Sequence, residues 1–392
     1  MTNNTQRVSE LSFLSSAKRE NTVADKSNGT TKQMDFSLFY FANADGGESS
    51  EKYKLLIEGA KFADTHGFAA VWTPERHFHE FGGLYPNPSV TSAALATVTE
   101  RIQIRAGSVV LPLHDPLLVA EEWAVVDNLS HGRVAISFAS GWHANDFVIA
   151  PENYAHRKEI MLRGIETVRR LWRGEKVRRR DGNGTELEVR ILPRPIQREL
   201  PIWVTAAGSP ETFRSAGEVG ANLLTHLLNQ SIEQLAEKIA IYRSAWREHG
   251  HGPGTGHVTL MIHTFVGSSV DEVREKVRRP FSDYLRSSVE LWLARSPGQE
   301  IGDFTEEELA DLVSYAFDRY FETSGLFGTP NTCLEMIDRL KLIGVDEFAC
   351  LIDFGVDFDS TIASLRYLDK VRELTNTSSG RVKGETQSFT SS

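Results

Sequence analysis

Apolar positions along the middle of the chain alternate between two patterns. Short continuous runs of aliphatic and aromatic residues are bounded by turn-forming residues and are typical of buried strands. Between them lie longer segments in which apolar residues recur every three or four positions, as in helices that cover a sheet. The runs predict strands at residues 35–41, 68–72, 102–111, 134–138, 201–206, 221–225, 257–266 and 345–352.

Helical spacing follows the strands throughout this region. The predicted helices are residues 51–66, 88–99, 116–129, 157–172, 210–217, 232–248, 329–343 and 360–374. Pro116 and Pro330 stand near the first turn of their helices, and Thr329 is a suitable cap. Eight strands that alternate with helices predict a single (β/α)8 TIM barrel rather than two domains.

Two segments do not fit the plain repeat. Residues 176–192 carry Asp-Gly-Asn-Gly between two β-like runs, which predicts an inserted hairpin. Residues 281–326, after the seventh strand, are long, aromatic and charged. They are interpreted as a partly ordered lid over the barrel mouth, or as a helical insertion that packs on the outside.

The two ends of the chain are polar. Residues 1–33 and 375–392 are rich in Ser, Thr and Asn, which predicts disordered extensions around a folded body at residues 34–374.

The net charge of −10 argues against a nucleic-acid-binding surface. No apolar run is long enough to span a bilayer, and the N-terminus lacks the layout of a signal peptide. Cys333 and Cys350 are expected to be buried free thiols, and the protein is expected to be cytoplasmic.

A loop at residues 73–88 follows the second strand and concentrates ionisable groups. Glu75, Arg76 and His77 are expected at the barrel mouth, where TIM barrels place their chemistry. The alternative is a solvated ion pair between Glu75 and Arg76 beside incidental histidines. His77 and His79 also suggest metal ligands, but no fourth ligand is evident and no metal site is predicted.

Two further strand ends have room for a ligand. Gly107 interrupts a β-branched strand, which indicates a close backbone approach, a bulge, an unusual peptide or a tightly packed barrel layer. The fourth strand ends in small residues that would accommodate a planar group, and His143 and Asn145 follow as possible hydrogen-bonding partners. A plain loop is the alternative at residues 138–147.

The fifth strand runs through residues 204–209 into a predicted helix. Gly208, the potential cap Ser209 and the free amides of the first turn form an anion site suited to phosphate. Glu211 in that turn could satisfy the same amides itself. The dinucleotide and Walker glycine patterns are absent. A barrel, a planar ligand and a phosphate point to a flavin, although the pattern does not separate FMN from other phosphorylated ligands.

The chain resembles the bacterial-luciferase-like flavin monooxygenases over residues 34–374. It is most similar to the branch that works with polyketide and peptide synthetases in natural-product biosynthesis. The resemblance lies in three stretches, VWTPERHFHEFGGLYPNPSVTSAALA, SVVLPLHDPLLVAEEWAVVDNLSHGRVAISFASGWHANDF and PIWVTAAGSPETF. It implies a (β/α)8 barrel that binds FMN at the carboxyl ends of its strands.

The resemblance also implies roles for individual residues. The Gly107–Ser108 bond matches a non-prolyl cis peptide against which the flavin lies, and Glu75 and His77 match polar positions near flavin and substrate. The residues that match the phosphate-binding turn are Ala207, Gly208, Ser209 and Thr212.

Several positions depart from the pattern of the luciferases. Ala139 replaces a reactive cysteine, Arg76 a histidine base, and Ser140 an arginine that reaches the phosphate. Light emission is therefore not expected. Arg157, with Tyr154 beside it, is the predicted replacement as phosphate partner.

The predicted function is a monooxygenase that uses O2 and reduced FMN supplied by a separate reductase. The substrate is expected to be an acyl or aminoacyl compound, either free or bound as a thioester to a carrier protein, that undergoes Baeyer–Villiger insertion or hydroxylation. Arg76, His77 or His143 would control the proton that decides between them. A synthetase assembly and a homodimer are the other expected partners.

Three alternatives remain open. They are an F420-dependent oxidoreductase on the same barrel, a flavin-binding scaffold without turnover, and an unrelated phosphate-binding barrel such as an aldolase. The aldolase reading lacks a lysine at any predicted strand end.

Overall fold

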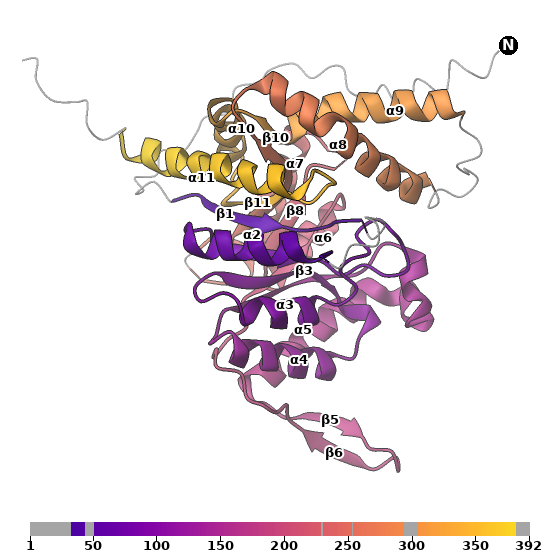
Figure 1. The fold of residues 1–392 in the computed structure, drawn as a ribbon. Coiled ribbons are helices and arrows are strands. Elements are labelled where there is room, and N and C mark those ends of the chain that lie inside the picture. The colour runs from indigo at the N-terminus through magenta and orange to yellow at the C-terminus, as the bar shows by residue number, and fades with distance from the viewer. Residues whose placement is uncertain (1–32, 44–50, 229, 253, 294–304, 382–392) are drawn as a thin grey trace, which may run out of the picture. The chain divides into compact units, whose positions relative to one another are not determined.

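Eight parallel strands form a closed barrel. The computed structural model describes residues 33–43, 51–228, 230–252, 254–293 and 305–381 (Figure 1). The pairing of β9 with β8 and β11, and of β11 with β1, closes the ring, so the predicted (β/α)8 barrel and its eight strands are confirmed. The barrel strands are β1 (Asp35–Phe39), β2 (Ala70–Thr73), β3 (Gln103–Val110), β4 (Val134–Ala139), β7 (Ile202–Thr205), β8 (Asn222–His226), β9 (Val258–Val266) and β11 (Glu347–Leu351).

The connecting helices begin at local sequence signals. The side chain of Asp115 accepts a hydrogen bond from the Leu117 amide and caps α4, and Thr329 caps α10 ahead of Pro330. The predicted helices all occur, with some bounds shifted by a few residues. They are α2 (Lys54–Thr65), α3 (Pro88–Ala96), α4 (Pro116–Leu129), α5 (Arg157–Arg173), α6 (Pro210–Glu218), α7 (Ile232–Glu248), α10 (Pro330–Leu342) and α11 (Phe358–Arg381).

The last helix, α11, continues past residue 374, where the sequence places the end of the folded body. Thr375 is buried, and the side chain of Asn376 bonds the backbone N–H and C=O of Met34 at 2.9 and 3.1 Å. These contacts hold the helix against the start of β1, so the predicted boundary of disorder at residue 375 is wrong. The remaining tail, 382–392, and the predicted extension at 1–32 lie outside the described residues.

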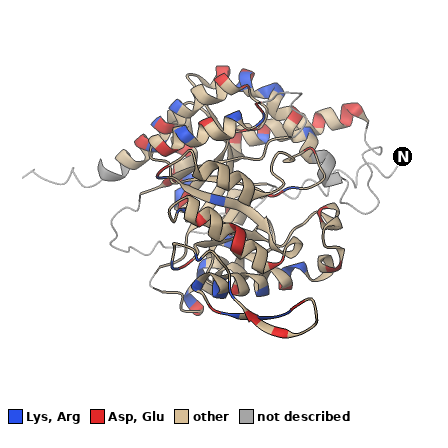
Figure 2. Ribbon diagram, turned by 60° about the horizontal axis from the view of Figure 1, so that its bottom comes forward, with Lys and Arg blue, Asp and Glu red and all other residues tan. Residues whose placement is uncertain are grey.

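The predicted hairpin insertion is confirmed. Strands β5 (Val177–Arg180) and β6 (Glu186–Val189) pair in antiparallel register and extend from the barrel (Figure 1). The side chain of Asp181 accepts hydrogen bonds from the amides of Asn183 and Thr185, which fixes the turn. Charged residues cover this hairpin and the outer faces of the helices (Figure 2).

The segment predicted as a lid or an outer insertion is helical where it is described. Helices α8 (Val270–Leu293) and α9 (Glu306–Arg319) lead into a π-helical turn and the short strand β10 (Leu326–Gly328), which pairs with the end of β9. Phe281 and Tyr284 of α8 pack against His263 of β9, with ring centroids 5.0 and 5.5 Å apart. The helices therefore belong to the same hydrophobic cluster as the barrel interior and do not pack only on its outside.

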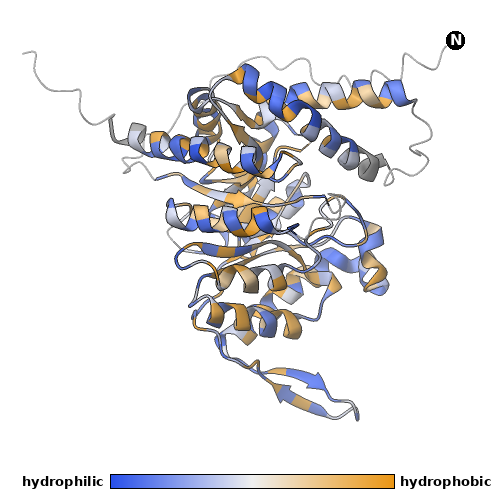
Figure 3. Ribbon diagram, in the orientation of Figure 1, coloured by the Kyte–Doolittle hydropathy of each residue, from blue (hydrophilic) through white to orange (hydrophobic). Residues whose placement is uncertain are grey.

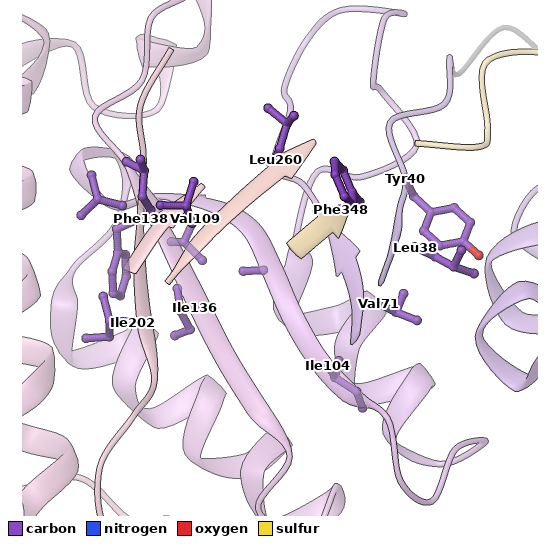
Figure 4. Packing of buried hydrophobic residues seen from close by; sticks show 14 of the residues in the cluster. Leu38, Tyr40, Val71, Ile104, Val109, Ile136, Phe138, Ile202, Leu260 and Phe348 are labelled. Carbon is purple, nitrogen blue, oxygen red and sulfur yellow. The ribbon is translucent and has the colours of Figure 1, made fainter. Parts of the chain in front are cut away.

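Two apolar layers hold the barrel together. The outward-facing strand residues pack in one cluster with residues of the helices. Figure 4 shows Val71, Ile104, Ile136 and other strand-side members of this cluster. Apolar residues accordingly line the strands and the inner sides of the helices (Figure 3). Among the described helices none is long and apolar enough to cross a membrane.

The barrel interior is filled at its amino-terminal end by a buried ion pair. Arg105 donates to both carboxylate oxygens of Glu347 at 2.8 and 3.0 Å, and its guanidinium lies over the rings of Trp72 and Trp203. His257 adds a further contact to Glu347 at 2.9 Å. Since this end is closed by packed side chains, a ligand site is left to the carboxyl ends of the strands.

Candidate functional site

Side chains from neighbouring strand ends converge on the loop that follows β2. In the barrel β2 lies beside β3, β3 beside β4, and β4 beside β7, so the four predicted site segments share one edge. Glu75 contacts the end of β3, since its Oε2 accepts the Val110 amide at 2.6 Å. Arg76 reaches the segment after β4, where its Nη1 lies 3.0 Å from Asp146 Oδ2. The first three segments are therefore in direct contact.

Glu75 is a fully buried carboxylate between two imidazoles. Its Oε1 lies 2.8 Å from His77 Nε2 and 2.5 Å from His114 Nε2. Burial by itself would raise the pKa of Glu75, but the hydrogen bonds from His114 and His77 outweigh it and hold the pKa below its usual value. The pKa of His114 is raised by Glu75 against the effect of burial. Glu75 and His114 therefore form an ion pair, and the predicted alternative of a solvated Glu75–Arg76 pair is wrong.

His114 is a site residue that the sequence reasoning missed. It stands in the stretch after the third strand, directly before Asp115 and Pro116, and its contact with Glu75 crosses 39 positions of sequence. Glu75, His77 and His114 also place three possible metal-ligand atoms within 4.8 Å of one another. The His-x-His pair itself is not such a group, because His79 Nδ1 accepts the Phe81 amide instead.

Arg76 is buried in a second polar group at the barrel mouth. It is 3% exposed, and its Cζ lies 5.2 Å from the centre of the Trp142 ring. Its partner Asp146 also faces His143, whose Nδ1 lies 3.5 Å from Asp146 Oδ1. Burial, and then the charge of Arg76, lower the pKa of His143. Burial raises the pKa of Asp146, although Arg76 and His143 oppose it.

The predicted catalytic residues thus lie together at the carboxyl ends of the strands, although one predicted neighbour does not face the site. Glu75, Arg76, His77 and His143 all lie there, in two adjacent networks. Asn145 is exposed, and its neighbour Asp146 is the buried residue of that segment.

The turn before α6 has the geometry of an anion site. Ser209 is the N-cap of α6 without using its side chain, and a Cβ added at Gly208 would meet no atom within 4 Å. Glu211 is 87% exposed and faces Lys158 at 3.8 Å, so in the described residues it does not cap the first-turn amides. Ala207, Gly208, Ser209 and Thr212 therefore leave open space above the positive end of a helix.

A cation is fixed on the neighbouring helix. The guanidinium of Arg157, at the start of α5, donates to the carbonyls of Gly141 and Tyr154 at 3.1 and 2.8 Å and lies over the Tyr154 ring. The contact between Lys158 and Glu211 shows that the first turns of α5 and α6 are neighbours. Ser140, half-buried, directly follows the adjacent strand β4. These residues fit the phosphate end of a flavin nucleotide.

The peptide bond between Gly107 and Ser108 differs from the prediction. The one cis peptide among the described residues is Leu192–Pro193, so Gly107–Ser108 is trans. A Cβ at Gly107 would lie 2.7 Å from the Phe39 ring and 3.2 Å from Trp72 Cβ, which means that packing inside the barrel requires glycine here. The predicted bulge is present, since the register of β3 against β4 shifts between Ala106 and Val109.

Comparisons with known proteins agree with this fold and site. Residues 34–347 match the family described as luciferase-like monooxygenase. The oxygenase component of flavin-dependent trigonelline monooxygenase from Acinetobacter baylyi is 29% identical over 345 residues, which cover 85% of this chain and 92% of that protein. The chain therefore belongs to the luciferase-like monooxygenase family and is an enzyme of the flavin-dependent monooxygenase type.

Solved structures share the same barrel. Monooxygenase RslO1 from Streptomyces bottropensis superposes with a TM-score of 0.71 at 25% identity, covering 86% of this chain and 98% of that one. The oxygenating constituent of 3,6-diketocamphane monooxygenase from Pseudomonas putida, in complex with FMN, has a TM-score of 0.69 over 88% and 98% of the two chains. An F420-dependent secondary alcohol dehydrogenase has a TM-score of 0.63 over 86% and 98%. The last two are 18% identical to this chain and show the fold alone.

Proposed function

We propose that this protein is an FMN- and O2-dependent monooxygenase of biosynthetic acyl compounds. The observation that carries the proposal is the convergence of two buried polar networks with an open anion site on adjacent strand ends. In the reaction, reduced FMN supplies two electrons, one atom of O2 enters the substrate and the other leaves as water. The product is an ester or lactone if oxygen is inserted beside a carbonyl, and an alcohol if a carbon is hydroxylated.

The phosphate end of FMN would be held by the turn before α6. The amides of Gly208 and Ser209, the hydroxyls of Ser209 and Thr212, and the guanidinium of Arg157 supply donors of the kind a phosphate requires. Ser140 and Tyr154 lie at the same end of the site. Gly107 and Ser108 would form part of the wall toward the ring system, with a trans peptide between them.

The chain's own residues would control the proton and the substrate. Glu75 fixes the orientation of the His77 ring through Oε1, so that His77 presents its other nitrogen in a defined direction. His143, whose pKa is lowered by burial and Arg76, is neutral at pH 7 and is suited to accept a proton. Arg76 and Trp142 form the wall beside it.

Several finer features belong to the same proposal. A separate flavin reductase would deliver reduced FMN, in line with the relative that is the oxygenase component of its enzyme. The substrate would be an acyl or aminoacyl compound, free or bound as a thioester to a carrier protein of a polyketide or peptide synthetase. A homodimer is supported by four exposed apolar side chains on α3 and α4, which are Val90, Leu118, Val125 and Leu129.

An F420-dependent hydride transfer is the second candidate, because a structure of that class shares the fold. The two are separated by anaerobic titration of the apo-protein with reduced FMN and with reduced F420, followed by mixing with O2. The proposal predicts tight binding of reduced FMN and one added oxygen atom in the product, seen by mass spectrometry. Tight binding of F420 without binding of reduced FMN would contradict it.

A further inference from the structure

Buried polar atoms without a hydrogen-bond partner are concentrated beside Arg76. The described residues contain nine such side-chain atoms, and four of them belong to one contiguous group. They are Nε and Nη2 of Arg76, Nδ1 of His143 and Oδ1 of Asp146. The last two face each other at 3.5 Å, so the donors left for a ligand are Nε and Nη2 of Arg76. Buried polar groups are normally paired, because leaving one without a partner forfeits its hydration with nothing in return. A cluster of unmade bonds in a candidate site therefore indicates a polar ligand that completes it.

The free atoms of Arg76 lie on one edge of its guanidinium. Nη1 is occupied by Asp146 Oδ2 at 3.0 Å, and the Trp142 ring covers a face of the group. This arrangement leaves Nε and Nη2, whose N–H bonds point in parallel and match the two oxygens of a carboxylate. The other nearby carboxylate cannot serve this edge, because Glu75 is already bonded to His77, His114 and the Val110 amide.

Arg76 contacts one protein carboxylate and can also pair with a second anion. Asp146 is the carboxylate that contacts the guanidinium, and it divides its oxygens between Arg76 and His143. A neutral ligand would leave the guanidinium edge poorly matched, since a carbonyl presents one acceptor to two donors. A planar anion with two equivalent oxygens satisfies both.

We propose that the Nε–Nη2 edge of Arg76 binds a carboxylate of the substrate, so that the enzyme acts on an organic acid. The inference rests on the proposed function, in which the loop after β2 forms the substrate side of the flavin pocket. Of the acyl substrates considered above, it selects those that keep a free carboxylate. Trp142, which is 37% exposed and lies between β4 and the next helical turn, is the partly exposed side chain over the guanidinium.

A second occupant of the edge is the reduced flavin itself. The N1–C2=O edge of the reduced ring also offers two acceptors to an arginine. If a substrate carboxylate occupies the edge, an Arg76 substitution changes the preference for an acid over its amide. If the reduced flavin occupies it, the substitution changes the affinity for reduced over oxidised FMN.

The test uses the full chain loaded with FMN and matched pairs of small probes. Benzoate is compared with benzamide, and hexanoate with hexanamide and methyl hexanoate, by tryptophan fluorescence and by calorimetry. Trp142 beside Arg76 is the expected reporter, so W142F should lose the fluorescence change but keep the heat of binding. We expect each carboxylate to bind at least about tenfold more tightly than its neutral partner.

Arg76→Gln should remove this preference, and Arg76→Lys should restore only part of it because lysine lacks the paired donors. Since Arg76→Gln strands Asp146 in a buried position, the double variant R76Q/D146N removes both charges and serves where the single variant does not fold. The control R163Q, on the outer side of α5, should behave as wild type.

Equal binding of acids and amides to the FMN-loaded protein, or no binding of either, overturns the proposal. A loss of affinity confined to reduced FMN in R76Q/D146N also overturns it, because it assigns the edge to the flavin. FMN affinity is measured on every variant. A wild-type protein that does not bind FMN refutes the proposed function instead, and the two failures are thereby distinguished.

Discussion

At the scale of single residues, the site depends on which partner each ionisable group finds. Glu75 lies next to Arg76 in sequence and yet bonds His77 and His114, while Arg76 bonds Asp146, 70 positions away. The result is two separate networks, one centred on a carboxylate and one on a guanidinium. Substitutions in the first should affect proton handling, whereas in the second those at Arg76 should affect the choice of substrate and those at His143 proton transfer.

His77→Ala should lower oxygenation while FMN stays bound. The imidazole faces the site and is not part of the turn before α6, so its loss removes a proton-transfer group and no phosphate contact. A loss of about 10²-fold in single-turnover product formation is expected for a general acid or base. FMN affinity, measured by flavin fluorescence, should change little. Wild-type product formation would remove His77 from the mechanism.

Glu75→Gln should destabilise the protein, and more so at low pH. The raised pKa of His114 means that its pair with Glu75 contributes fully below the unfolded histidine pKa and is lost as pH rises through the folded pKa. Leaving the half-buried His114 without its carboxylate costs about 1–3 kcal/mol. Urea unfolding at pH 6 and pH 9 measures the difference from wild type. A difference that grows toward pH 9 would contradict the assigned ion pair.

At the scale of elements, the elements themselves were predictable and their contacts were not. Each strand has one face toward the helices, which is apolar, and one toward the packed interior, which is apolar in part, and such runs stand out in a sequence. The start of α10 could be read from Thr329 and Pro330. The end of α11 could not, since a polar segment became ordered through the contact of Asn376 with Met34.

The same distinction applies to the site. The segments 73–88 and 138–147 were predicted because ionisable residues follow buried strands. His114 and Asp146 were not selected, since their roles depend on the register between strands and on loop conformations that set which side chain points inward. The cis peptide expected at Gly107–Ser108 is absent from the described residues, where the glycine is instead required by Phe39.

The turn before α6 gives a prediction for the cofactor. Gly208→Asp should weaken FMN binding at least about tenfold, or ~1.4 kcal/mol, by placing a carboxylate at the phosphate. The added Cβ meets no protein atom within 4 Å, so thermal stability without FMN should be unchanged. Gly208→Ala is the matched control and should bind FMN nearly as wild type does. Unchanged affinity in the aspartate variant would refute the assignment of this turn.

At the scale of the whole molecule, buried histidines couple stability to pH. Burial lowers the pKa of His263 to about 3 and that of His226 to about 4. Below the unfolded pKa near 6.5 the unfolded chain binds protons that the folded barrel does not, so these groups destabilise the fold as pH falls. Asp353 acts in the opposite direction, because burial raises its pKa to about 7. The wild-type pH profile is therefore a sum of opposing contributions.

The substitution His263→Phe isolates the contribution of His263 to the pH dependence of stability. The ring lies among Phe281, Tyr284 and Tyr320, and its Nε2 has no partner, so a phenyl ring should be accommodated. Between pH 6 and pH 5 the unfolding free energy of the variant should fall less steeply than that of wild type, by about 1.4 kcal/mol per pH unit. Denaturant unfolding measures both slopes, and the exposed His156→Gln should leave the slope unchanged. Equal slopes for wild type and H263F would show that His263 is protonated in the folded state.

The ion pair at the other end of the barrel has a practical consequence for altering this enzyme. Glu347 and Arg105 close the amino-terminal end together with Trp72 and Trp203, and none of the four is among the mouth residues Arg76, Trp142 and His143. Substitutions at this end should therefore act mainly on resistance to unfolding, whereas those at the mouth should also act on substrate range. Libraries randomised at the exposed Trp142, with the Arg76–Asp146 pair kept and with screening against acids of different length, should yield more folded clones with new specificities than libraries at Glu347, Arg105, Trp72 and Trp203.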